Sequence, residues 1–276
     1  IFSRMDDMFG TTFMKDNLDS GLWSGQGLVA RVKDDKIITD KDGNEEVIQG
    51  VEKKNVLFFQ PEISEQLKAT YTQGNNLPEV LMNLYDFGTH GSVVKGDPQQ
   101  TSDAHVNILA NSTIHSLNDL VTSKLKNNGF ANRFLWFRIF RVQYLPEGGE
   151  ALDYDSIARE LKPILDRASM IREVIRDQAA TTYWDKIYKD LSKESAGLNG
   201  VLLNRAEAIC TRLQVLFCAI NGREDINVDD IDCSLEIWKL ATASVYDIFG
   251  DTSDDTGNPM ANKLRDILVA NLSEEP

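Results

Sequence analysis

Three short apolar runs stand out in the first half of the chain, at residues 56–59, 106–110 and 134–140. The first two are continuous or nearly so, which is typical of strands covered on both faces of a parallel or mixed sheet. The third run reads Phe-Leu-Trp-Phe-Arg-Ile-Phe and is rich in the residue types that favour strands. We therefore predict a strand at each of the three runs.

Helical patterns lie between the first two runs, at residues 63–71 and 77–87, and a polar loop is expected at 88–103. Strands that alternate with helices are typical of an α/β layer rather than of a β-sandwich. The first half of the chain is therefore predicted to be α/β, with a sheet flanked by helices.

The second half of the chain is helical in pattern. The strongest stripe of apolar residues at helical spacing covers 202–220. Asn227 and Asp230 have the spacing of a capping box at the start of a helix that runs to about Phe249. Further helices are expected at residues 154–178, where Pro163 should start or kink an element, at 182–192 and at 262–272.

These patterns divide the chain into three segments. The proline and paired glycines at 145–149 break regular structure, so residues 1–145 are expected to form the α/β core and 146–250 a helical subdomain. Residues 251–276 read as an acidic linker followed by the start of a further segment. Because the chain lacks an initiator Met and its last helix has nothing to pack on, we expect it to be part of a longer protein.

The composition is that of an acidic globular protein. Of 276 residues, 42% are hydrophobic, and 43 acidic against 29 basic residues give a net charge of −14. This charge argues against binding of nucleic acid by the whole surface. Binding through a local basic patch is the alternative, and its residues would be Lys124, Lys126, Arg133, Arg138 and Arg141. No apolar stretch approaches the roughly 20 residues of a membrane span. The three cysteines all fall late, which favours a reducing, cytoplasmic location.

Several common catalytic motifs are absent from the sequence. His90, His105 and His115 are scattered, and neither H-E-x-x-H nor paired C-x-x-C occurs, so a zinc site or a catalytic triad has no support. None of the 18 glycines is followed by lysine. The phosphate-binding loop G-x-x-x-x-G-K-[ST] is therefore not in this chain.

Glu62 follows the first predicted strand, in the segment Gln60-Pro61-Glu62. A carboxylate at the carboxyl end of a buried strand lies where α/β sheets bind their ligands. In phosphoryl transfer such a group orients a water molecule or holds Mg²⁺. The position after a proline also suits a carboxylate that stabilises a helix N-terminus. Both interpretations fit the sequence.

Polar residues recur at related positions further along the chain. Asn111 ends the second predicted strand, with a cap or turn role as the alternative. Arg133 immediately precedes the third predicted strand. The planar guanidinium group of arginine is suited to binding phosphate oxygens, and a surface ion pair is the alternative role. Arg205 opens the strongest helical stripe, with Arg212 two turns later, and solvated helix charges are the alternative. This order of elements is that of P-loop ATPases of the additional-strand, AAA+-like type.

The most specific segments are Gly-Phe-Ala-Asn-Arg-Phe-Leu-Trp at 129–136 and the strand end at 60–62. On the basis of these segments, the chain resembles the P-loop ATPase-like domain of unknown function in phage- and plasmid-encoded primase–helicase-like proteins. The resemblance covers about residues 20–272. Further matching segments lie at 24–28, 74–77 with Asp86, 104–108, 145–149, 204–207 with 212–213, and 248–251.

The resemblance implies a role for each candidate residue. Glu62 would polarise the attacking water, Asn111 would sense the γ-phosphate, and Arg205 would be the sensor arginine of a helical lid. Arg133 resembles an arginine finger that acts on a neighbouring subunit's nucleotide, which requires a homo-oligomer. ATP and Mg²⁺ would be the cofactors, with Gln60, Glu62 and Arg205 at the nucleotide.

The function implied is ATP hydrolysis coupled to DNA handling in a mobile-element replication or defence protein, with a primase domain or subunit as a further partner. The family's phosphate-binding loop should lie upstream of Ile1, and a winged-helix-like segment should continue from 262–272. Gln60 stands where the family commonly has an acid, and a neutral amide is a poor ligand for Mg²⁺. A catalytically weak or inactive oligomerisation module is therefore the main alternative, and a DNA-binding module the third.

Overall fold

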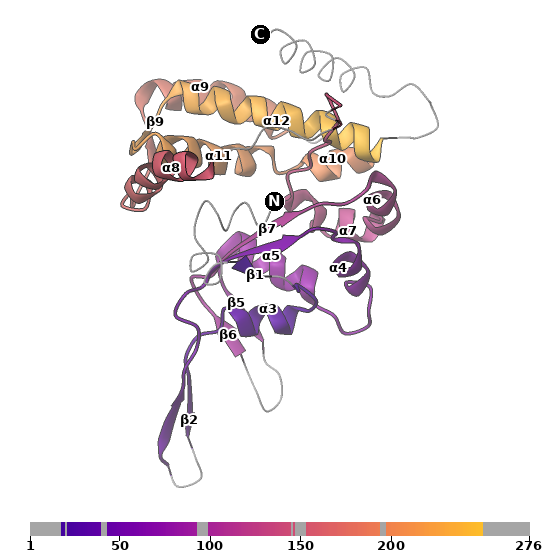
Figure 1. Cartoon of the computed structure of the whole chain (residues 1–276), viewed down its shortest axis with the longest axis vertical. Coiled ribbons are helices and arrows are strands. Elements are labelled where there is room, and N and C mark those ends of the chain that lie inside the picture. Colours follow the sequence, from indigo (N-terminus) through magenta and orange to yellow (C-terminus); the bar gives the residue numbers. More distant parts are fainter. Residues whose placement is uncertain are drawn as a thin grey trace. The chain divides into compact units, whose positions relative to one another are not determined.

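The computed structural model describes residues 18–19, 21–39, 43–92, 99–144, 146, 153–193 and 197–250. The chain divides into two compact units between Arg133 and Phe134 (Figure 1), earlier than the boundary expected near residue 145. Apart from Pro146, the segment 145–149 lies outside the described residues, as do the linker and helix expected at 251–276.

A parallel sheet forms the centre of the first unit. In the described chain, β4 (Asn55–Gln60) lies between β1 (Leu18–Asp19) and β7 (His105–Ala110) and is parallel to both. Asn55 pairs with His105 and Gln60 with Ala110, so β4 and β7 end level with each other. The strands predicted at 56–59 and 106–110 are confirmed, and so is the α/β class with a sheet flanked by helices. The expectation that both strands are covered on both faces holds for β4 and is wrong for β7, whose residues are alternately exposed and half-buried.

Helices flank this sheet, and its central strand β4 is buried over most of its length, from Val56 to Gln60. After β4 come α4 (Ser64–Ala69) and α5 (Leu77–Phe87), close to the two predicted helices, and α5 contacts β7. The remaining helices of the unit are α3 (Gly25–Arg31), α6 (Ile114–Leu120), α7 (Ser123–Asn127) and the 3₁₀ turn η1 (Ala131–Arg133).

Gly25 lets α3 approach α5 closely. It is buried at the start of α3, directly after the N-cap Ser24, whose hydroxyl accepts a hydrogen bond from the Gly27 N–H at 3.1 Å. A Cβ atom at position 25 would overlap the side chains of Asn76 and Val80 at the start of α5. The glycine is thus explained by packing between two helices.

Two antiparallel hairpins complete the first unit. β2 (Lys36–Thr39) pairs with β3 (Glu45–Ile48), and β5 (His90–Ser92) pairs with β6 (Gln99–Thr101). The second hairpin lies where a polar loop was predicted, so that prediction is wrong in part. The residues of β6 gain long-range partners: the Asp34 N–H donates to the Gln100 carbonyl at 2.8 Å, and the buried Thr101 hydroxyl donates to the Val32 carbonyl.

The strand predicted at 134–140 does not form. Residues 134–144 have no regular secondary structure. Instead, the Trp136 ring contacts Phe249 edge-on with centroids 5.2 Å apart, and Arg138 pairs with Asp247 at 3.2 Å. This apolar run therefore packs through its side chains onto a helix of the second unit, while Phe137 stays 43% exposed.

The second unit is mainly helical, as predicted. Its helices are α8 (Tyr154–Ala168), α9 (Gln178–Leu191), α10 (Gly197–Leu203), α11 (Ala206–Ile220) and α12 (Val228–Phe249). A short parallel pair, β8 (Ile175–Arg176) and β9 (Asp225–Ile226), joins them.

The structure differs from the helical prediction in detail. The helix expected at 154–178 ends at Ala168, and β8 occupies part of the remainder. Pro163, which was expected to start or kink an element, does not start one and lies inside α8. The stripe at 202–220 is divided between α10 and α11 at Asn204 and Arg205.

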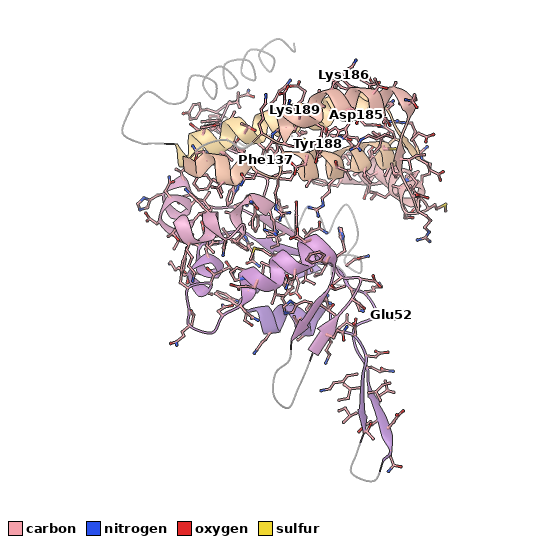
Figure 2. The ribbon with its side chains drawn as sticks, turned by 180° about the vertical axis from the view of Figure 1, so that it is seen from behind. Glu52, Phe137, Asp185, Lys186, Tyr188 and Lys189 are labelled. Atoms are coloured by element: carbon pink, nitrogen blue, oxygen red, sulfur yellow. The ribbon has the colours of Figure 1, made fainter. Side chains whose placement is uncertain are left out.

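Trp184 lies in the core of this unit, on the buried face of α9, with Ala180 on the same face. Figure 2 labels four exposed residues of α9: Asp185, Lys186, Tyr188 and Lys189. The Arg176 guanidinium lies over the Trp184 ring, 4.3 Å from its centroid. It also donates to the buried Gln214 at 3.0 Å and to Thr211 at 3.1 Å. Arg176 thus joins β8, α9 and α11.

The predicted capping box of α12 is confirmed. The Asn227 side chain accepts from the Asp230 N–H at 3.1 Å, and the Asp230 carboxylate accepts from the Asn227 N–H at 3.0 Å. Asp230 is buried and also pairs with Arg223 at 2.6 Å. The start of the longest described helix is therefore fixed by three polar contacts.

We expect Gly25→Ala to destabilise the protein by about 1–3 kcal/mol, because the added methyl group overpacks the contact between α3 and α5. Chemical denaturation measures the change. Gly91→Ala is the matched control, since a Cβ at position 91 meets no atom within 4 Å. Equal stability of the two variants would contradict this account of Gly25.

We expect one of the three thiols to react with a disulfide reagent in the folded protein. Cys210 and Cys218 are buried, and burial raises the pKa of Cys210 to about 12 and raises that of Cys218. Cys233 is exposed. The absorbance of the released thiolate counts the reactive groups; Cys233→Ser should remove the fast phase, and denaturant should expose the remaining thiols.

Candidate functional site

The carboxyl ends of β4 and β7 are joined beyond the strands themselves. The Asn111 N–H donates to the Gln60 carbonyl at 2.9 Å, and the Ile63 N–H donates to the Asn111 carbonyl at 3.0 Å. These bonds continue the ladder of the parallel pair into the two following loops. Gln60, Glu62 and Asn111 are therefore brought to one edge of the sheet, which is the edge where α/β sheets bind ligands.

The Glu62 carboxylate is held through one of its two oxygens. Oε1 accepts from the Ser64 N–H at 3.1 Å, from the Ser64 hydroxyl, and from the Ser112 hydroxyl at 2.8 Å. Ser64 comes from the start of α4, and Ser112 comes from the loop after β7. Oε2 accepts no hydrogen bond from any described residue, so it is available to a water molecule or ligand.

These contacts keep Glu62 ionised. The hydrogen bond from the Ser64 hydroxyl has the largest effect and lowers the pKa of Glu62. Partial desolvation, the second-largest effect, raises the pKa, and Ser112, the Ser64 N–H and Lys68 lower it further, so the net shift is downward. A carboxylate with a lowered pKa is a weak base but a good hydrogen-bond acceptor. The site is therefore suited to orienting a water molecule rather than to storing its proton.

Both interpretations of Glu62 from the sequence have structural support. The bond from the Ser64 N–H places the carboxylate at the first turn of α4, as a helix-terminal acid would be. The bond from Ser112 places it across from β7, at the sheet edge. One side chain occupies both positions because α4 begins directly at that edge.

Gln60 is 3% exposed, and its Nε2 finds no hydrogen-bond partner among the described residues. A buried amide N–H without a partner costs free energy comparable to a lost hydrogen bond. An oxygen of a water molecule or a ligand would satisfy it. Gln60 thus places a buried, neutral and unpartnered donor at the residue that ends β4.

The Asn111 side chain is exposed, and the hydrogen bonds that tie this residue to β4 come from its backbone. The cap of the following helix is supplied by Thr113, whose hydroxyl accepts from the Ser116 N–H at 3.1 Å. The cap role considered for Asn111 therefore belongs to Thr113.

Arg133 is engaged within the first unit. Its side chain is 11% exposed, and it forms an ion pair with Asp86, donates to the Gly129 carbonyl and lies 5.7 Å from the centroid of the Tyr85 ring. None of these partners is Gln60, Glu62 or Asn111. The ion pair considered as the alternative for Arg133 is present, and it is partly buried rather than on the open surface.

Arg205 belongs to the second unit, where it occupies the N-cap position of α11 and is half-buried. Arg212, two turns later, is exposed. Within the first unit, the structure therefore brings together three of the candidate residues and gives Arg133 other partners.

The basic patch considered for DNA binding does not form as one exposed surface. Lys126 is 7% exposed, and Arg138 pairs with Asp247 and stacks 4.8 Å from the Phe140 centroid. With Arg133 paired as well, only Lys124 and Arg141 of the five are exposed. Arg138 and Arg141 also belong to a different unit from Lys124.

Ser64 and Ser112 belong to the candidate site, although neither was among the site residues predicted from the sequence. Ser64 follows Glu62 by two positions, a spacing at which a side chain can accept from a backbone N–H, and this was a usable signal. Ser112 lies 50 residues from Glu62 along the chain. Its contribution depends on the parallel pairing of β4 and β7, which no local pattern gives.

No protein-family model matches the chain, and no curated protein matches it. Within the described part of the chain, no group of three or more His, Cys, Asp or Glu side chains is placed to hold a metal ion. None of the described helices has the length and apolar character needed to cross a membrane.

Removing either serine hydroxyl should raise the pKa of Glu62 toward its usual value, with the larger rise in Ser64→Ala. Because the folded-state pKa is lowered, the stabilising contribution of these bonds is present above the unfolded pKa and is lost as pH falls through the folded one. A ¹³C NMR titration of the Glu62 carboxyl measures the shift. Ser116→Ala, which touches Thr113 instead, should leave it unchanged; an unshifted pKa in Ser64→Ala would contradict the geometry.

Proposed function

We propose that the chain forms the core and helical lid of a P-loop-type ATPase that couples ATP hydrolysis to DNA handling in a mobile-element replication or defence protein. The observation that carries the proposal is the ionised Glu62 carboxylate, held by Ser64 and Ser112 at the carboxyl edge of the parallel sheet. The resemblance of 129–136 and 60–62 to such domains supports it.

In this proposal Glu62 orients the attacking water through Oε2, while Oε1 stays bound to the two serines. Fixing one oxygen limits the side chain to a narrow range of positions, which favours an aligned water over a mobile one. Asn111 follows the neighbouring strand at the same edge of the sheet, and its exposed side chain would contact the terminal phosphate. The unpartnered Nε2 of Gln60 adds a donor for a phosphate or water oxygen.

In this proposal a magnesium ion would be held chiefly by nucleotide phosphates and water. Mg²⁺ in such sites commonly takes one or two carboxylates; Glu62 would meet the ion through a water molecule, because its Oε1 is bound to the serines and its Oε2 orients the attacking water. When bound, the ion would neutralise phosphate charge. The phosphate-binding loop itself would come from a part of the longer protein that this chain does not contain.

Arg133 can act as a finger only if it leaves Asp86. An arginine supplied to a neighbouring subunit's nucleotide must extend from its own subunit, whereas this side chain is 11% exposed and ion-paired. We infer that assembly of a homo-oligomer would exchange the Asp86 pair for the phosphate. Arg205 and the helical unit would serve as the lid.

A second candidate function is a non-catalytic oligomerisation module with the same fold. Two observations favour it: the neutral Gln60 stands where an acid would assist the metal, and Arg133 is ion-paired with Asp86 and bonded to the Gly129 carbonyl. In that case the buried groups serve stability alone.

ATP turnover by the native protein that contains this chain tests the proposal. Glu62→Gln should lower kcat about 100-fold or more while nucleotide binding persists, and Arg133→Ala should lower it by roughly 10³–10⁵. The matched controls are Glu65→Gln, whose carboxylate pairs with Lys68, and Arg138→Ala, whose guanidinium pairs with Asp247.

Asp86→Asn separates catalysis from structure, because it frees Arg133 without removing it. A finger predicts near-normal turnover in Asp86→Asn, whereas a purely structural pair predicts equal losses in both variants. Absence of ATP binding by the native protein would favour the non-catalytic module. Unchanged turnover in both Glu62→Gln and Arg133→Ala would refute the assigned roles.

A further inference from the structure

The ribbon formed by β2 and β3 exposes aliphatic side chains on both of its faces. Ile37 and Val47 are opposite each other in the register and are 63% and 57% exposed. Ile38 and Ile48, on the other face, are 38% and 39% exposed. No position of the ribbon is buried, although exposed aliphatic clusters usually mark contact surfaces.

The ribbon also leaves strand edges without a strand partner. In the described chain this sheet has two strands, so each has an outer edge (Figure 1). An isolated two-stranded ribbon is marginally stable, and an open edge is a template for a further strand. The edge and the aliphatic faces therefore call for the same kind of partner, an additional β-strand.

We propose that β2 pairs antiparallel with β2 of a second copy of this chain, about a two-fold axis at Ile37. Residues that face each other across an antiparallel pair are both hydrogen-bonded to that neighbour or both turned away from it. These two orientations alternate along β2. A residue of β2 can therefore lie opposite the same residue of the second copy, or opposite a residue that is an even number of positions away in the sequence. Centring on Ile37 sets Ile37 against Ile37 of the second copy, and Lys36 against its Ile38.

This register gives one face an unbroken aliphatic row across four strands. Val47 and Ile37 of one copy continue directly into Ile37 and Val47 of the other, because each pair is directly opposite in its ribbon. Cross-strand aliphatic pairs of this kind stabilise sheets. No two like charges stand directly opposite each other in this arrangement.

Charge favours the edge of β2 over that of β3. Glu45 and Glu46 are adjacent in β3, so pairing β3 with itself would put four carboxylates on two neighbouring strands, in a chain with a net charge of −14. Pairing through β2 leaves them on the two outer strands. The proposal concerns assembly alone and stands whether or not the chain hydrolyses ATP.

Disulfide trapping tests the register in a Cys233→Ser background, because the other two cysteines are buried. Directly opposite residues are about 4.5–5.5 Å apart at Cβ, so Ile37→Cys should cross-link into a covalent dimer under mild oxidation. Val47→Cys is the matched control: in the proposed sheet the two positions are three strand spacings apart, roughly 14 Å, and cannot be bridged.

Light scattering over a concentration series tests the same interface without a cross-link. Ile37→Lys sets two ammonium groups opposite each other and should raise the dimer dissociation constant about 10-fold or more. Val215→Lys, at a 38% exposed aliphatic on α11, should leave it unchanged, and circular dichroism checks that both variants fold.

Each alternative result overturns the proposal. A native chain that stays monomeric throughout the series has no such interface. A dimer that Ile37→Lys does not weaken assembles elsewhere, and cross-linking of Val47→Cys in place of Ile37→Cys assigns the contact to β3.

Discussion

The parallel pairing of β4 with β7 is the constraint on which the candidate site depends. The two strands end level, and the bonds from Asn111 to Gln60 and from Ile63 to Asn111 extend their ladder past the last paired residues. The loop after β7 is thereby held beside the start of α4. Ser112 reaches Glu62 only because of this, so a shift of register would separate the two halves of the site.

Local pattern was sufficient where a segment has a strongly marked composition or spacing. β4 and β7 could be predicted because their runs are almost wholly apolar, although only β4 is buried. The start of α12 could be predicted because Asn227 and Asp230 have the spacing of a capping box. The run at 134–140 has the same strand-forming composition and yet forms no strand, because α12 supplies Phe249 and Asp247 as partners for Trp136 and Arg138. Composition indicates that such a segment needs a partner, and it does not say which kind.

The candidate site shows the same division. Glu62 and Asn111 could be placed from the sequence because each ends a recognisable strand. The Arg133–Asp86 pair joins residues 47 positions apart, and the Ser112–Glu62 bond joins residues 50 apart. Both depend on tertiary packing, so neither can be read from spacing. Arg133 illustrates the consequence, since its position before an apolar run fits a finger or an ion pair, and only its surroundings show the pair.

The start of α12 shows how a side chain's length, rather than its charge, can carry structural information. Asp230 accepts from the Asn227 N–H with one oxygen and from Arg223 with the other, while its own N–H bonds to Asn227. A glutamate there would carry the same charge, but its extra methylene would move the carboxylate away from one partner or the other. Position 230 therefore has a narrow tolerance for exchange between two acids that are interchangeable at most surfaces.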